Sequence, residues 1–122
     1  MKLTNNHIYT YTKQLIESFQ DSAQYLPIKL NFFIQKNKEI LLGLTQEIEK
    51  NREEIIRHYA DVNDADGSYT VAQENVNALN SELYDLGNIE QEVEIRTIKF
   101  DTIPDDISLT TGQMEAIMFM ID

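Results

Sequence analysis

The chain of 122 residues contains no cysteine and no tryptophan, and it has only two prolines, four glycines and two histidines. Without cysteine the protein can form neither a disulfide nor a thiolate metal site. No apolar run approaches the roughly 18 residues that a membrane-spanning helix needs. The opening Met1-Lys2-Leu3 leads directly into polar residues, so we expect no secretory signal peptide. These absences favour a soluble, intracellular protein without a membrane partner.

The sequence patterns of well-known catalytic and cofactor sites are missing too. There is no glycine-rich phosphate loop, no nucleophile elbow and no Cys–His pair. Zinc usually takes three or four His, Cys or carboxylate ligands, whereas Glu54 and His58 share a helix face with no second histidine. We interpret His58 as a cation near the C-terminal dipole of a helix. The sequence therefore predicts a protein that is not an enzyme and holds no cofactor or metal.

Basic residues are scarce in the second half of the chain. The formal net charge is −11; residues 1–60 hold eight Lys or Arg against seven Asp or Glu, whereas residues 61–122 hold two against fourteen. Nucleic acid would be repelled by the second half, which argues against direct nucleic-acid binding. Two interpretations remain. The acidic half is either a solvated surface that aids solubility or a face that docks on a basic partner.

The sequence does contain a long helical pattern, within what we expect to be a single domain over residues 1–122. Pro27 suits a first helical turn, and we predict one unbroken helix over about residues 27–60. The two seam positions of a heptad repeat fall on Ile34, Leu41, Ile48 and Ile55, and on Leu30, Asn37, Leu44 and Asn51. Such a repeat is typical of a helix that lies along partners. The two asparagines would cost stability but fix the register where they are buried.

Three shorter helices are expected on both sides of this one. Each has apolar side chains three or four residues apart, and each follows a residue that can cap a helix N-terminus. The predicted helices cover residues 5–19 after Thr4, residues 71–86 with Thr70 and Gln73 at capping-box spacing, and a last helix from Thr110 and Gln113 through Ile121.

From residue 89 to residue 100 the apolar period changes to two, as in a half-buried strand. Val93 and Ile95 fall on one face, whereas Ile98 and Phe100 fall on the other. A shift of one residue reverses the side chains of a strand, so we expect a bulge or break near Arg96.

The predicted fold is mainly α with a minor β element: a long central helix packed with two or three shorter helices, and strands near residues 69–71 and 91–100. The β-prone segments 69–71 and 107–109 are the candidate partners of the late strand. Residues 61–68 form the clearest turn signal in the chain.

Part of this turn, Asp64-Ala65-Asp66-Gly67, resembles a calcium-binding loop. Counting from the glycine, however, places Val62 and Gln73 at two decisive ligand positions, where neither side chain can replace a carboxylate. We interpret the segment as a polar turn.

Two stretches are candidate protein-binding surfaces. The acidic stretch forms a column on the polar face of the late strand and continues beyond it, where solvation or a basic partner explains it better than acid–base catalysis. The last helix is apolar on almost every side, so it belongs either to the core or to an interface with a partner or another copy. The candidate residues are Glu90, Glu92, Glu94, Asp101, Asp105, Asp106, Met114, Met118 and Phe119.

Several short motifs, in this order, resemble a set of small, poorly characterised proteins encoded by phages and prophages of Gram-positive bacteria. They are Leu26-Pro27-Ile28-Lys29 leading into Gln35-Lys36-Asn37; Glu47-Ile48-Glu49-Lys50 through Glu54-Ile55-Ile56 to Tyr59; Ser68-Tyr69-Thr70-Val71; Glu90-Gln91-Glu92-Val93-Glu94-Ile95; and Leu109-Thr110 through Gln113-Met114 to Phe119-Met120-Ile121. One departure is Thr111, where the relatives tend to carry proline. The resemblance implies a helical accessory protein of phage origin, with no known reaction.

We therefore expect a non-catalytic phage accessory protein that binds another protein, of phage or host, or itself, in virion assembly or self-association. The alternative is an acidic inhibitor of a host defence or nucleic-acid-binding enzyme, whose C-terminal half mimics phosphate charge. Either protein would work in the host bacterial cytoplasm or in the virion.

Overall fold

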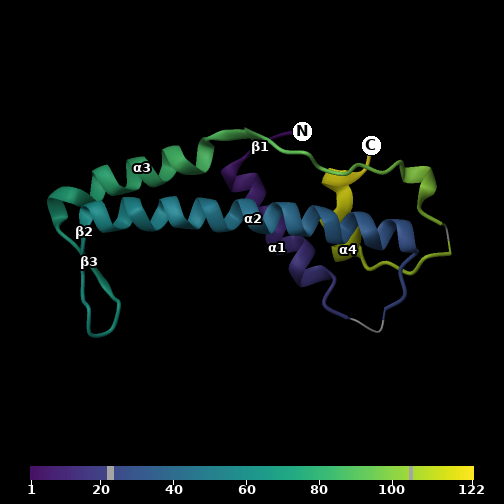
Figure 1. Ribbon diagram of the computed structural model, residues 1–122, viewed down its shortest axis with the longest axis horizontal. Helices are drawn as coiled ribbons and strands as arrows, with labels where there is room; N and C mark the ends of the chain where they lie inside the picture. The colour runs from purple at the N-terminus through teal and green to yellow at the C-terminus, as the bar shows by residue number, and fades with distance from the viewer. Residues whose placement is uncertain (22–23, 105) are drawn as a thin grey trace.

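The computed structural model describes residues 1–21, 24–104 and 106–122 (Figure 1). A helix of 32 residues, α2 (Ile28–Tyr59), runs along the long axis of the molecule. Three shorter α-helices accompany it in the described part of the chain: α1 (Asn5–Ser18), α3 (Val76–Asn88) and α4 (Thr111–Ile117). Short antiparallel strand pairs complete the fold, so the predicted mainly α architecture around a long helix is confirmed.

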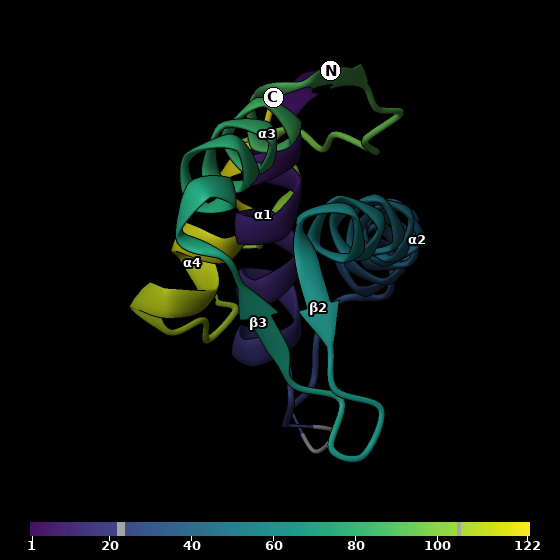
Figure 2. The same cartoon turned by 90° about the vertical axis from the view of Figure 1, so that its left-hand side faces the viewer.

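The helices form two unequal groups along α2. The helix α1 crosses α2 near its middle, and α4 packs on the far side of α1, so α1 lies between the other two (Figures 1 and 2). The helix α3 runs antiparallel beside the C-terminal half of α2 (Figure 1). The main core therefore lies where α1 meets the N-terminal two thirds of α2.

Burial along α2 follows the predicted seam. Ile34 and Leu41 are completely buried and Ile48 is 3% exposed, because these side chains face α1 and the segments packed beside it. Asn37 is also completely buried, whereas Asn51 is exposed and bonds only to the carbonyl of Glu47 in its own helix. Only one of the two seam asparagines is therefore placed to fix a register.

Two of the predicted helix caps are confirmed. The amide of His7 donates to Oγ1 of Thr4 at 3.1 Å, at the start of α1. At the start of α4, Thr110 and Gln113 form a complete capping box. This helix is shorter than predicted, because it ends at Ile117 and continues as a 3-10 turn, η3 (Met118–Met120).

The third predicted cap is wrong. Thr70 lies in a strand, β3 (Tyr69–Val71), opposite Asp61 of β2 (Ala60–Val62), so its side chain caps no helix. A 3-10 turn, η1 (Gln73–Asn75), follows instead, and α3 begins only at Val76. Pairing with the neighbouring strand takes precedence over the local capping pattern.

The strands β2 and β3 form a hairpin whose loop contains the predicted polar turn. The amide of Gly67 donates to the carbonyl of Asn63 at 2.7 Å, and Gly67 has a φ of 72°, a conformation that favours glycine. The hairpin projects from the end of α2 as a short arm (Figure 1).

The predicted partners of the late strand are both wrong. That strand, β4 (Glu90–Glu92), pairs antiparallel with β1 (Lys2–Thr4) at the N-terminus, with Leu3 opposite Gln91. Residues 69–71 are already paired in the hairpin. The strand β1 has only three residues, and the last of them, Thr4, is also the cap of α1. Three residues are too few to show an alternation of apolar and polar side chains, so the sequence pattern did not indicate β1.

The late strand also ends earlier than predicted. Val93 still exchanges backbone hydrogen bonds with Met1, at 2.8 and 2.9 Å, and the pairing stops there. The amide of Ile95 then turns back to the carbonyl of Val93 at 2.9 Å. The expected break is therefore present, but it begins at Val93, before the predicted position near Arg96. Val93 and Ile98, which would lie on opposite faces of a regular strand, are both buried. Ile98 then makes a parallel bridge to Ile121.

Asn37 replaces the missing strand partner after the break. Its Oδ1 accepts the amide of Arg96 at 2.7 Å, and its Nδ2 donates to the carbonyl of Arg96 at 2.9 Å. One buried side-chain amide thus satisfies both backbone groups of one residue, which would otherwise be costly to bury.

We predict that Asn37→Leu lowers the free energy of unfolding by about 2–4 kcal/mol. Leucine is similar in shape to asparagine, but it leaves the two backbone groups of Arg96 without partners. Asn51→Leu is the matched control, and it should change stability by less than about 0.5 kcal/mol. Urea unfolding followed by circular dichroism measures both values. Equal effects of the two substitutions would contradict this role for Asn37.

Candidate functional site

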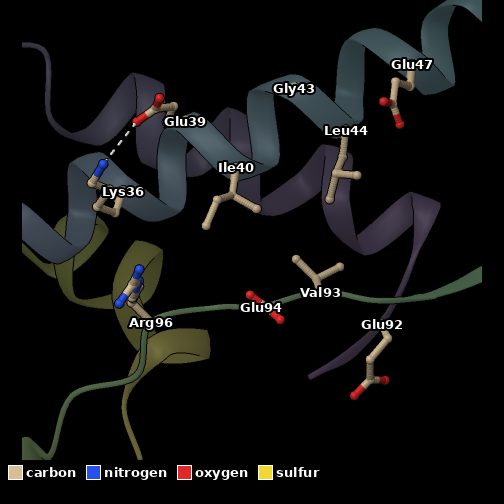
Figure 3. Close-up of a pocket in the computed structure, with 10 residues that line it drawn as sticks. All are labelled: Lys36, Glu39, Ile40, Gly43, Leu44, Glu47, Glu92, Val93, Glu94 and Arg96. Carbon is tan, nitrogen blue, oxygen red and sulfur yellow. Dashed lines mark ion pairs between the residues drawn. The ribbon is translucent and has the colours of Figure 1, made fainter.

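An open groove of about 590 Å³ lies between α2 and the extended segment 92–96 (Figure 3). It is lined by Lys36, Glu39, Ile40, Gly43, Leu44 and Glu47 of α2 and by Glu92, Val93, Glu94 and Arg96 of the segment. We call this feature the α2 groove. Its two walls are far apart in the sequence, and the hydrogen bonds between the Asn37 side chain and the backbone of Arg96 join them.

The floor of the α2 groove is apolar. Ile40 and Leu44 point from α2 toward Val93 of the opposite wall (Figure 3). Val93 is 2% exposed, whereas Ile40 and Leu44 are only partly buried. Burying the remaining apolar area against a partner would be favourable, at roughly 25 cal/mol per Å² of apolar surface removed from water.

The two ends of the α2 groove carry opposite charge. Figure 3 shows Lys36 and Arg96 at one end, and Glu47 and Glu92 at the other. Glu39 lies at the first end too, 3.9 Å from Lys36, so that end keeps one net positive charge. Glu92 is 73% exposed and lies 3.5 Å from the N-terminal ammonium group, so this contact screens only part of its charge. The groove is thus an apolar trough with a basic end and an acidic end.

Gly43 leaves the middle of the α2 wall bare. A Cβ atom placed on Gly43 would meet no atom within 4 Å, so packing inside the chain does not require glycine there. Glycine inside a helix costs about 0.5–1 kcal/mol relative to alanine. The backbone of α2 is therefore open to close approach from outside at this point.

The acidic residues predicted as a binding surface do not form one site. Glu92 and Glu94 line the α2 groove, but Glu90 does not, and it lies 3.9 Å from Lys2 across the β1–β4 pair. Asp101 and Asp106 are exposed away from the groove, and Asp105 lies outside the described residues.

The Met-rich C-terminal segment belongs mainly to the core. Met120 is completely buried, Met114 is partly buried, and Phe119 stacks on Tyr11 with ring centroids 4.4 Å apart. Met118 is the exception, because it is 62% exposed. Of the predicted apolar candidates, only Met118 is available to a partner without rearrangement.

The residues that resemble a calcium loop bond to their own turn. The amide of Ala65 donates to Oδ1 of Asn63, and the amide of Ser68 donates to Oδ1 of Asp66, which lowers the pKa of the Asp66 carboxyl. His58 is exposed near the end of α2, with its ring against Tyr59. Within residues 1–21, 24–104 and 106–122, no group of three or more His, Asp or Glu side chains is placed to hold a metal ion.

A second polar cluster joins α1 to α2. The hydroxyl of Tyr9 donates to the carboxylate of Glu49, and Arg52 lies 3.9 Å from the same carboxylate. Burial and this hydrogen bond raise the pKa of Tyr9 well above its ordinary value. The phenol therefore stays protonated as a donor, and the cluster acts as a tie between helices.

Sequence reasoning missed the basic end and the floor of the α2 groove. Lys36, Ile40 and Leu44 share one helix face, but only the structure shows which segment lies opposite them. The available signal was Gly43, a lone glycine inside a strongly helical stretch.

Comparison of the chain with models of known protein families, with curated proteins and with solved structures finds no match. In the part of the chain that the structure describes, no helix combines the length and the apolar character needed to cross a membrane.

We predict that Gly43→Ala raises the free energy of unfolding by about 0.5–1 kcal/mol, because the methyl group meets open space while the helix gains propensity. Gly87→Ala is a matched control in α3, and it should gain less, because its Cβ would lie 2.5 Å from Oδ1 of Asn6 and would have to displace that side chain. Chemical unfolding of dilute protein measures both. A destabilising Gly43→Ala substitution would contradict the open space at this position.

Proposed function

We propose that this protein is a non-catalytic, phage-encoded accessory protein that works by binding another polypeptide along the α2 groove. The observation that carries the proposal is the apolar floor of Ile40 and Leu44, left partly uncovered between walls that carry charge at both ends. A phage origin is supported by the motifs over residues 26–121 that resemble small phage and prophage proteins.

The form of the groove suits a protein ligand. It is open, its floor is apolar, and it lies between a helix and the segment 92–96. Apolar grooves of this kind can take the apolar face of an amphipathic helix. Apolar anchors in the middle with charged residues around them also match the core and rim of protein interfaces. The partner is a phage or host protein, or another copy of the chain, in virion assembly or self-association.

A second candidate function uses the acidic half of the chain instead. Glu90, Glu94, Asp101 and Asp106 are all exposed, and they belong to the half of the chain with a formal charge of −12. These exposed carboxylates, although they do not form one site, would attract the basic groove of a host defence or nucleic-acid-binding enzyme by imitating phosphate charge. Its binding would weaken steeply with salt, because exposed charges are screened over about 10 Å at 0.1 M.

Site-specific photo-crosslinking distinguishes these functions. A benzophenone amino acid replaces Glu39 at the rim of the groove, Phe100 beside the acidic surface, or Glu53, an exposed residue two heptads further along α2 that lies outside the groove. Each variant is irradiated in host cells, and the adducts are identified by mass.

We expect adducts with a polypeptide from position 39 and none from position 53, because only position 39 borders the groove. Adducts that form from position 100 but not from position 39 would favour the acidic inhibitor. Equal adducts from positions 39 and 53, or none from position 39, would overturn binding along the groove.

A further inference from the structure

We propose that the occupant of the α2 groove is a second copy of this chain, related to the first by a two-fold axis that passes close to Gly43. This inference rests on the protein-binding function proposed above and names its partner. The two copies would lie with their α2 helices antiparallel, each groove closed by the α2 helix of the other copy. Three independent features of the groove fit this arrangement.

The first feature is the spacing of the lining residues along α2. An antiparallel two-fold arrangement that places Lys36 opposite Glu47 of the second copy also places Glu39 opposite Leu44 and Ile40 opposite Gly43. All six lining positions of α2 therefore find their counterparts among the same six positions. A two-fold interface requires a surface that is complementary to itself in this way.

The second feature is the charge at the two ends. In the antiparallel arrangement, the end with Lys36, Arg96 and Glu39 meets the acidic end with Glu47 and Glu92 of the second copy. One net positive charge then faces two carboxylates, and this happens twice. A basic peptide would pair with the acidic end but would be repelled by the basic end. The opposite ends of the groove therefore favour a second copy over a uniformly charged ligand.

The third feature is the bare backbone at Gly43. A side chain that packs into a facing helix needs a hole between the side chains of that helix. With no Cβ on Gly43 and no atom of the chain within 4 Å of that position, such a hole is present, and the arrangement places Ile40 of the second copy over it. A glycine that costs helix stability then has a function in the assembly.

The arrangement also contains two kinds of unfavourable contact. The first is the carboxylate of Glu39 opposite the apolar Leu44. The second is between the two copies of Glu94, which would lie near the axis, because Figure 3 shows Glu94 below the Ile40–Gly43 stretch, midway between the charged ends. Two carboxylates close together repel each other. The two Glu94 carboxylates therefore weaken the dimer. A basic ligand would instead be attracted by Glu94, so removal of this charge distinguishes the two occupants.

The decisive test is a charge exchange measured by sedimentation velocity on purified protein. We expect the wild-type chain to form a dimer, and Lys36→Glu or Glu47→Lys alone to weaken it by about tenfold or more, since each places two like-charged pairs in the interface. The double variant restores opposite charges and should return to within about threefold of the wild-type dissociation constant. Lys50→Glu, an equal charge change on an exposed part of α2 outside the groove, should have little effect.

Two further variants test the centre of the interface. Gly43→Gln should produce a monomer that resists unfolding at least as well as the wild-type monomer, because the side chain fills the hole but touches nothing in its own chain. Glu94→Gln should tighten the dimer. A basic ligand predicts the reverse pattern, in which Lys36→Glu strengthens binding and Glu94→Gln weakens it.

A wild-type chain that stays monomeric at all concentrations, or a double variant that fails to recover, would overturn the second copy as occupant. If position 39 still forms adducts with a different polypeptide, the proposed function survives and only its partner changes. If position 39 forms no adducts of any mass, the proposed function fails as well.

Discussion

The pairing between the Asn37 side chain and the backbone of Arg96 determines how the two halves of this protein meet. The Asn37 side chain is completely buried, where an unpaired amide would be costly, and it holds the segment after β4 against α2 through both backbone groups of Arg96. The same contact builds the α2 groove. It holds the backbone of Arg96 against α2, so that the Arg96 side chain emerges beside Lys36, the residue before Asn37.

The long helix therefore has two different stripes next to each other on its surface. One stripe, with Ile34 and Leu41, is completely buried against the rest of the chain. The next stripe, with Ile40 and Gly43, is only partly covered. Alanine at position 43 would make the helix more stable, because glycine is a poor helix former. The glycine in this stripe is therefore a local conflict between sequence and structure, which an ordinary solvated helix face does not need.

Much of the fold could be predicted from the sequence because its signals are local. The heptad repeat of α2, the cap at Thr4 and the capping box at Thr110 each depend on residues within one or two helical turns, and the structure confirms them. The errors concern pairing over long distances. The β1–β4 pair joins residues about ninety positions apart, and the groove needs that same closure, so neither was visible in a period or a motif.

The distribution of charge suits an assembly that stops at two copies. In the proposed dimer the two α2 helices, which belong to the nearly neutral half of the chain, would approach each other, whereas the acidic residues of the other half, apart from Glu92 and Glu94 in the groove, would stay outside the interface. An interface built on a two-fold axis uses the same surface on both copies and leaves none free for a third. Mutual repulsion between the exposed acidic surfaces then opposes any less specific contact. In the proposed dimer, the nearly neutral half of the chain would permit one association, and the acidic residues around it would discourage the others.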